Sequence, residues 1–373
     1  MGDKGVKRMA VLLLLAGAVS SGEAQVTLPV EPVATWHDLS KLPVEGKGWQ
    51  KTKHAYDRLP AHAEAIVRAP VWSLAQDSAG LRYRFTTDAV FLRARWKLRR
   101  SRLAMSHMAA TGVSGLDLYI RDGGRWRWVG VGRPETPEGN EVTLVSGLKH
   151  EPREYMLYLP LYNGVDSVEI GLPADAQFKP APDRYNSLKP AVFYGTSILQ
   201  GGCAARPGMA YPSIIGRMLD WPTVNLGFSG NGKTEPELAK LLAELDPAVY
   251  VLDSLPNLDV AEVAERVEPF VRTLRLAHPN TPIILVENVT YSNAAFVQSR
   301  LAKVTAANEL LHKLYEKLKA HGDKNVYYVD TARLLGGDGE DTVDGSHPTD
   351  LGFIRIADGI APVVRNALQS VSK

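Results

Sequence analysis

Hydrophobic and polar residues alternate in several short runs along the first half of the chain. A period of two is typical of strands with one buried and one exposed face. It predicts strands at 81–85, 90–98, 115–121, 125–130, 155–161 and 165–172. Asp122-Gly123-Gly124 separates two of these runs, which predicts a hairpin. Short strands without helical stretches predict an antiparallel β-sandwich, jelly-roll-like in arrangement.

The second half alternates short apolar runs with longer stretches of helical periodicity. The apolar runs are 192–194, 223–226, 249–253, 282–286 and 326–329, and the helical stretches are 210–219, 235–244, 260–274, 301–318 and 351–368. Pro269 falls inside one predicted helix, where we expect it to kink the helix or to begin a second segment. Strands that alternate with helices predict five parallel strands covered on both faces, with right-handed crossovers.

A Pro-rich stretch at 178–183 separates the two patterns and reads as a linker. We therefore predict a domain boundary near Pro182, with the β-sandwich domain at 25–182 and the α/β domain at 183–373.

The first 24 residues have the character of a targeting segment. Lys4, Lys7 and Arg8 precede an apolar block, and small residues follow at 22–24. This order predicts a signal peptide at 1–24 and a secreted or periplasmic protein. A retained anchor or a buried N-terminal helix is the alternative. The block is too short for a spanning helix.

Net charge and cysteine content argue against several classes of protein. The net charge is +2 and no long basic run occurs, which argues against nucleic acid or an acidic membrane surface as a partner. Cys203 is the only cysteine, so an internal disulfide is impossible. No histidine or base motif adjoins it in the sequence, and we expect a small buried side chain rather than a nucleophile. The histidines lack metal-ligand spacing such as His-x-x-x-His, so no metal site is predicted.

Candidate chemistry follows the ends of four predicted strands. Ser197 comes after the first strand, Gly230 after the second, Asn257 after the third, and Asp344 and His347 past the fifth. Parallel strands present their carboxyl ends at one sheet edge, where α/β folds place ligands. Acyl transfer requires a nucleophile, a base and a group that orients the base, and Ser197, His347 and Asp344 supply these types. The N–H groups of Ser197 and Gly230 and the Asn257 amide are candidate donors to an oxyanion.

Four blocks in order resemble the SGNH (GDSL-like) hydrolases. Gly195-Thr196-Ser197-Ile198 is similar to the first block, with Thr196 in place of the usual Asp. Ser229-Gly230-Asn231-Gly232 is similar to the second and Leu255-Pro256-Asn257 to the third, although Leu258 follows where an Asp is common. Asp344 and His347 have the spacing of the fourth. The segment 115–119 resembles part of the β-domain that precedes one bacterial branch of the superfamily.

The resemblance implies a flavodoxin-like three-layer α/β/α domain with five parallel strands behind the β-sandwich. It also implies a serine esterase, without metal or organic cofactor, that acts through an acyl-enzyme on short acyl groups. The expected substrates are acetylated carbohydrates or other small esters. One alternative is a lipid or thioester hydrolase, with Leu199, Phe228 and Leu255 lining an acyl channel. The other is a glycan-binding protein without activity.

Other residues near the blocks have simpler interpretations. Arg206 could face a substrate carboxylate or acyl oxygen, but a loop-bracing ion pair is favoured. Gly227 is expected to permit tight packing between strand and loop. For Asp253 and Asp259 we expect helix capping or surface positions.

Overall fold

The computed structural model describes residues 33–185 and 187–371. The predicted signal peptide at 1–24 lies outside these residues and stays a prediction. From Ala34 onward the chain forms one compact unit. Within the described residues, no helix combines the length and apolarity needed to cross a membrane.

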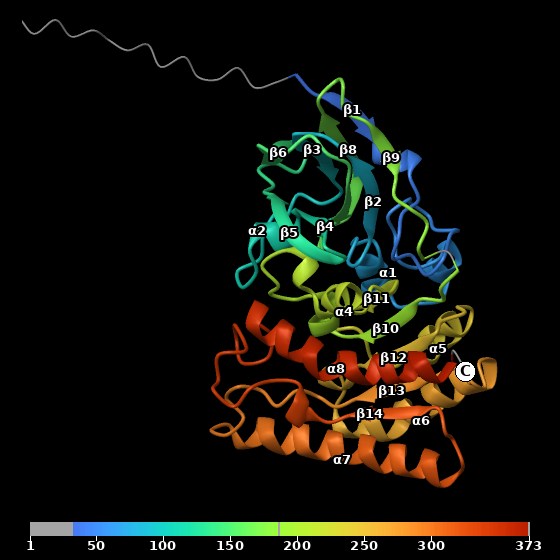
Figure 1. The fold of residues 1–373 in the computed structure, drawn as a ribbon. Helices are drawn as coiled ribbons and strands as arrows, with labels where there is room; N and C mark the ends of the chain where they lie inside the picture. The colour runs from blue at the N-terminus through green and yellow to red at the C-terminus, as the bar shows by residue number, and fades with distance from the viewer. Residues whose placement is uncertain (1–32, 186, 372–373) are drawn as a thin grey trace, which may run out of the picture. The chain divides into compact units, whose positions relative to one another are not determined.

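The first half forms two antiparallel sheets that pack into a β-sandwich (Figure 1). The strands are β1 (Thr35–Asp38), β2 (Arg82–Thr87), β3 (Phe91–Leu98), β4 (Leu116–Asp122), β5 (Arg125–Gly132), β6 (Asn140–Ser146), β7 (Arg153–Tyr158), β8 (Val165–Leu172) and β9 (Phe178–Pro180). The orders are β1-β8-β3-β6 and β5-β4-β7-β2-β9. Inward-facing side chains such as Phe85, Trp96 and Leu118 form one core. The sandwich and the predicted β4–β5 hairpin are confirmed.

Three details of the first half differ from the sequence prediction. Strands β1, β6 and β9 were not predicted, because they are short or carry weak alternation. Part of the stretch taken as a linker is β9, whose Pro180 is tolerated at a sheet edge. The expectation of no helices is wrong, since α1 (Ala69–Ala75) and the short α2 (Ala110–Val113) occur there. Pro70 lies in the first turn of α1, where its missing N–H is not needed.

The second half is a parallel sheet between two layers of helices. Its strands are β10 (Ala191–Gly195), β11 (Thr223–Gly227), β12 (Val249–Asp253), β13 (Ile283–Val286) and β14 (Val326–Val329), in the order β11-β10-β12-β13-β14. Its helices are α3 (Ser197–Gln200), α4 (Tyr211–Leu219), α5 (Pro236–Ala243), α6 (Val260–Ala277), α7 (Gln298–Ala320) and α8 (Asp350–Val371). This order is the flavodoxin-like one, as predicted. Pro269 lies inside the single helix α6.

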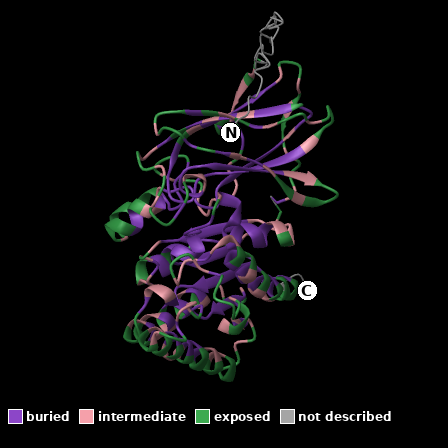
Figure 2. Ribbon diagram, turned by 90° about the vertical axis from the view of Figure 1, so that its left-hand side faces the viewer, coloured by how far each residue is buried: buried purple, intermediate pink, exposed green. Residues whose placement is uncertain are grey.

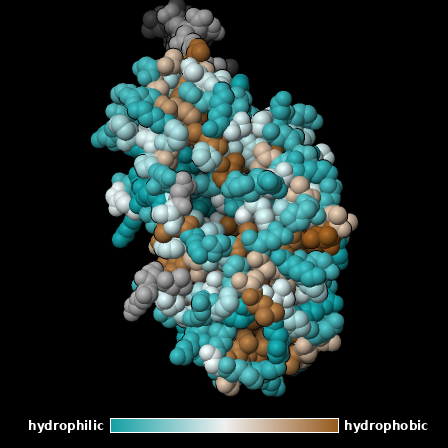
Figure 3. Space-filling view, turned by 90° about the vertical axis from the view of Figure 1, so that its right-hand side faces the viewer, coloured by the Kyte–Doolittle hydropathy of each residue, from teal (hydrophilic) through white to brown (hydrophobic). Residues whose placement is uncertain are grey.

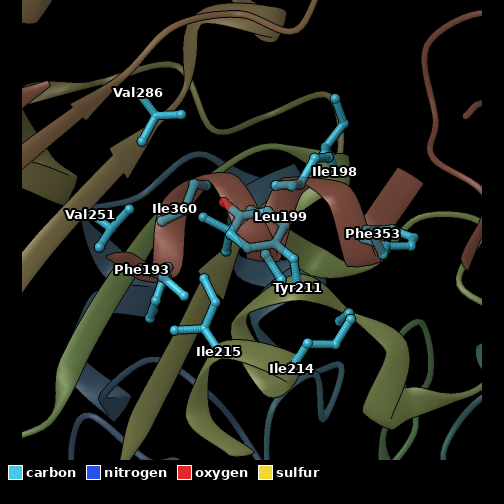
Figure 4. Packing of buried hydrophobic residues seen from close by; sticks show 14 of the residues in the cluster. Phe193, Ile198, Leu199, Tyr211, Ile214, Ile215, Val251, Val286, Phe353 and Ile360 are labelled. Atoms are coloured by element: carbon cyan, nitrogen blue, oxygen red, sulfur yellow. The ribbon is translucent and has the colours of Figure 1, made fainter. Parts of the chain in front are cut away.

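Each face of the parallel sheet has its own hydrophobic core. Phe193 and Val251 point toward α4 and α8, where they meet Ile215 and Ile360 (Figure 4). The neighbouring strand residues contribute to a second core, under α5, α6 and α7. Both faces of the strands are therefore buried (Figure 2), which explains their continuous apolar runs. Hydrophilic side chains cover most of the face in Figure 3, with apolar ones in small separate groups.

Candidate active site

Strands β10, β11 and β12 end at one level. Gly195 at the end of β10 pairs with Gly227 of β11 on one side and with Asp253 of β12 on the other. Ser197, Gly230 and Asn257 follow these strand ends by a few residues each. The sheet register thus brings the candidate nucleophile and both candidate oxyanion loops to one edge.

Ser197, His347 and Asp344 form a continuous series of hydrogen bonds. Ser197 Oγ lies 2.9 Å from His347 Nε2, and His347 Nδ1 lies 2.7 Å from Asp344 Oδ2. Because an ionised carboxylate can only accept, Nδ1 carries the proton and Nε2 accepts from the serine hydroxyl. Ser197 is 8% exposed, and 25% of the His347 side chain is accessible. His347 Nε2 can therefore take the proton of the Ser197 hydroxyl, and the imidazole that takes it is partly accessible to solvent.

Asp344 is held as a carboxylate by its own turn. Partial burial alone would raise its pKa. The backbone N–H of His347, the imidazole and the backbone N–H of Ser346 outweigh burial and hold the pKa of Asp344 well below its usual range. The two backbone hydrogen bonds reach Oδ1 at 2.9 Å from His347 and 3.0 Å from Ser346. One oxygen therefore fixes the turn while the other orients the imidazole.

The candidate oxyanion donors lie on loops that contact each other. Gly230 has φ +66°, a left-handed conformation that favours glycine, and space is open where a Cβ would be. Among the described residues, no partner accepts the N–H of Ser197 or Gly230. When the Asn257 amide is oriented to satisfy its neighbours, Oδ1 accepts from the N–H groups of Asn231 at 3.1 Å and Gly232 at 3.2 Å. In this orientation Nδ2, the candidate donor, faces hydrogen-bond acceptors rather than other donors.

Comparisons with known proteins agree with this geometry. Residues 188–365 match the GDSL-like lipase/acylhydrolase family, and residues 34–178 match the N-terminus of SGNH-hydrolase-type esterases. A crystal structure from Bacteroides ovatus ATCC 8483, described as a GDSL-like lipase, is 36% identical with a TM-score of 0.85. That alignment covers 90% of this chain and 98% of the other. The chain belongs to the GDSL-like family of SGNH hydrolases.

Two more distant structures share the fold of this SGNH hydrolase. The salicylyl-acyltransferase SsfX3 from a tetracycline biosynthetic pathway has a TM-score of 0.68 at 20% identity, covering 91% of this chain and 98% of that one. A family two carbohydrate esterase from Cellvibrio japonicus has a TM-score of 0.53 at 17% identity, covering 79% and 90%. At such identities the likeness concerns the fold alone. A comparison with curated proteins gives no match.

Gln200 supports the candidate oxyanion loop, residues 229–232, a role that the sequence analysis missed. The Gln200 side chain is fully buried. Its Oε1 accepts from the N–H of Ser229 at 3.0 Å, and its Nε2 donates to Asp77 at 3.2 Å and to the Leu161 carbonyl at 3.1 Å. Gln200 thereby ties the residue before Gly230 to the segment that precedes β2. No motif signals such a role, because the partners are distant in sequence.

Arg58 holds the end of the strand that carries the same loop. Its guanidinium is buried and donates to the carbonyls of Asn225 at 3.1 Å and Gly227 at 2.8 Å, both on β11. Burial lowers the pKa of Arg58 to about 10, opposed by the negative charge of Asp77. Burial of this cation is offset by four hydrogen bonds, since Nε and Nη2 also donate to the carbonyls of Asp77 and Leu74. The N-terminal half of this SGNH hydrolase thus contributes directly to the shape of the active site.

The structure agrees with three of the remaining predictions and contradicts the fourth. Arg206 forms the expected bracing ion pair, with Asp117 of β4 at 2.8 Å. Gly227 permits close packing, since a Cβ there would lie 2.2 Å from the Gln200 nitrogen. Asp259 caps α6 in a capping box, as predicted. The expectation for Asp253 is wrong. It is buried at the end of β12 and accepts from the Tyr211 hydroxyl at 2.8 Å.

Cys203 is buried, as expected. Burial, and secondarily the charge of Asp344, raise the pKa of its thiol to about 12. A nucleophilic thiolate is therefore disfavoured. The expectation that no histidine adjoins Cys203 holds only along the sequence. In the fold, ligand atoms of His107, Cys203 and His347 lie within 4.8 Å of one another.

Proposed function

We propose that this SGNH hydrolase is a serine esterase that removes short acyl groups, acetyl in particular, from carbohydrates. The observation that carries the proposal is the hydrogen-bonded series of Ser197, His347 and Asp344. Each group has the partner that its role requires. The hydroxyl faces a neutral nitrogen, and the opposite nitrogen faces a carboxylate.

In the proposed reaction Ser197 Oγ attacks the acyl carbonyl while His347 Nε2 takes the hydroxyl proton. The negative charge that forms on the carbonyl oxygen is stabilised by the N–H groups of Ser197 and Gly230 and by Asn257 Nδ2. His347 then gives its proton to the leaving alcohol, and the acyl-enzyme forms. Water, deprotonated by His347, attacks the acyl-enzyme and releases the acid. Asp344 keeps the imidazole oriented throughout and stays ionised.

Burial around the site supports a short acyl group. The side chains that were candidates to line an acyl channel are Leu199, Phe228 and Leu255, and they are 0%, 0% and 2% exposed. Leu199 packs in the core under α4 and α8, and the other two pack in the core on the opposite face of the sheet. None of the three is free to hold a lipid chain.

Two observations support carbohydrates as the substrates. The Cellvibrio japonicus relative is described as a carbohydrate esterase, and it shares this fold. The predicted signal peptide would bring the enzyme to polysaccharides outside the cytoplasm. A lipid or thioester hydrolase is the competing function.

The test is a series of p-nitrophenyl esters from acetate to palmitate, followed by acetylated xylan and glucomannan. We expect kcat/KM to be highest for acetate and to fall by about tenfold or more at octanoate, since a long chain finds no apolar channel and would have to displace packed side chains. Acetate should be released from at least one polysaccharide. The matched control is Ser197→Ala with each substrate. A preference for long chains would overturn the proposal in favour of a lipase, and carbohydrate binding without turnover would favour the glycan-binding alternative.

A further inference from the structure

Three side chains with metal-ligand chemistry meet beside the proposed catalytic base. His107, Cys203 and His347 come from three separate segments, and their ligand atoms all lie within 4.8 Å of one another. The imidazole rings of His107 and His347 are 5.5 Å apart between centroids. Imidazole nitrogen and thiolate sulfur are the ligands that Zn²⁺ prefers.

The fold holds His107 close to Cys203 and His347. His107 occupies the tip of a tight turn closed by two backbone hydrogen bonds between Met105 and Met108, at 3.0 and 3.1 Å. Met108 is buried in the same core as Ala204, the residue after Cys203. Gly112 approaches so closely that a Cβ would lie 2.1 Å from the Ala204 carbonyl oxygen. The turn and the cysteine loop are therefore packed together, and His107 itself is exposed.

The loop that carries Cys203 lies directly against the base. At Gly202 a Cβ would lie 3.2 Å from the His347 ring and 3.1 Å from the Ser197 carbonyl oxygen. Cys203 has φ +73°, a left-handed backbone conformation that is unfavourable for a residue with a Cβ. The packing thus keeps the Cys203 thiol next to the His347 imidazole, although the backbone of Cys203 is strained.

Asp344 adds a feature of metal-binding histidines. It binds Nδ1 of His347 at 2.7 Å, so only Nε2 is left for an ion. A carboxylate behind a ligating imidazole fixes its orientation and raises its basicity. The hydrogen bond between Nδ1 and Asp344 makes His347 Nε2 a better proton acceptor. For the same reason it makes Nε2 a better ligand for a metal ion.

We propose that His107, Cys203 and His347 form an inhibitory site for Zn²⁺. The ion binds Nε2 of His347, a nitrogen of His107 and the sulfur of Cys203, whose thiol proton passes to solvent, and water completes the coordination. Ser197 then loses the acceptor for its proton, and the esterase stops. The inhibition rests on the proposed function of His347 as a base, whereas the binding of zinc does not.

The experiment titrates the metal-free esterase with zinc chloride, measuring chromogenic acetate turnover and zinc binding by calorimetry. We expect one high-affinity Zn²⁺ per chain, loss of activity with its occupancy, and recovery with EDTA. His107→Gln and Cys203→Gly should each raise the half-inhibiting zinc concentration about tenfold or more, because each removes one ligand. Glycine suits the φ of position 203, so the fold should survive. Without zinc, both variants should turn over acetate within about threefold of the wild type.

Two controls keep the conclusions separate. His312→Gln removes an exposed histidine on α7 and should leave zinc inhibition unchanged. Ser197→Ala should still bind one Zn²⁺ while being inactive. If Ser197→Ala keeps its turnover, the proposed function fails and the zinc site stands. The zinc site is refuted if the wild type does not bind one Zn²⁺ per chain, or if zinc inhibits His107→Gln and Cys203→Gly at the same concentration as it inhibits the wild type.

Discussion

Ser197 Oγ lies 2.9 Å from His347 Nε2, although 150 residues separate them in the chain. The end of β10 positions the serine, and the start of α8 follows His347 closely. Phe353 and Ile360 of α8 pack into the core that also holds Phe193 of β10. Burial of one helix face against the sheet therefore sets the distance between nucleophile and base.

Removal of the nucleophile should nearly abolish turnover. Ser197→Ala is expected to lower kcat on a chromogenic acetate by ~10³-fold or more, because no other group can form the acyl-enzyme. The thermal midpoint should stay within a few degrees of the wild type, since the substitution removes one oxygen from a small side chain. Turnover close to that of the wild type would end the serine mechanism.

Activity should fall as the pH is lowered from 8 to 5. Histidines in general gain a proton in this range, and a protonated imidazole cannot act as the base. Asp344 does not contribute to the fall, because its lowered pKa keeps it ionised far below pH 5. The measurement is kcat/KM against pH at constant ionic strength. A flat profile would contradict the role of His347.

Asn257→Ala should reduce kcat by about 10²- to 10³-fold with a smaller change in KM, because an oxyanion donor acts mainly in the transition state. Asn231→Ala is the matched control. The Asn231 amide braces the same loop through Ser229 and Arg68. We expect a much smaller loss of kcat there. Equal losses in both variants would mean that Asn257 only stabilises the loop.

Gln200→Leu tests whether the buried network positions the oxyanion loop. The variant has a side chain of similar size but removes the hydrogen bonds of Gln200 to the Ser229 N–H and to Asp77 Oδ2, while the ion pair of Asp77 with Arg100 remains. We expect kcat to fall by about tenfold or more with KM less affected, and the free energy of unfolding to fall by roughly 1–3 kcal/mol. A loss of stability with unchanged kcat would assign Gln200 a structural role only.

Asp253 should make the protein less stable as the pH rises. Burial raises its pKa to about 7, partly opposed by the hydrogen bond from Tyr211. The folded state therefore binds a proton more tightly than the unfolded chain, whose Asp pKa is about 3.9. Stability from this group is full below that value and is lost as the pH approaches 7.

Asp253→Asn keeps an acceptor for Tyr211 and removes the titration. Between pH 5 and pH 8 the wild type should lose roughly 2 kcal/mol more unfolding free energy than the variant. Urea denaturation of both proteins at the two pH values measures the difference. Parallel losses would show that Asp253 does not titrate in this interval.

The sequence predicted most of the architecture because hydrophobic periodicity is a local property. The predicted parallel strands all occur, and β12 spans the predicted residues 249–253. It missed β1, β6 and β9, which owe their strand structure to pairing with β8, β3 and β2. No second segment begins at Pro269, which lies inside the single helix α6, because packing of α6 on the sheet outweighs the local preference of proline.

Residue types and their order along the chain were enough to propose Ser197, Asp344, His347, Gly230 and Asn257. Only the tertiary structure revealed Gln200 and Arg58 behind the candidate oxyanion loop, or His107 and Cys203 beside His347. Buried polar groups must find partners wherever packing brings them, and those partners lie in segments far apart along the chain. Local sequence determined most of the strands and helices. The contacts between distant segments, which give the site its shape, depend on how those elements pack.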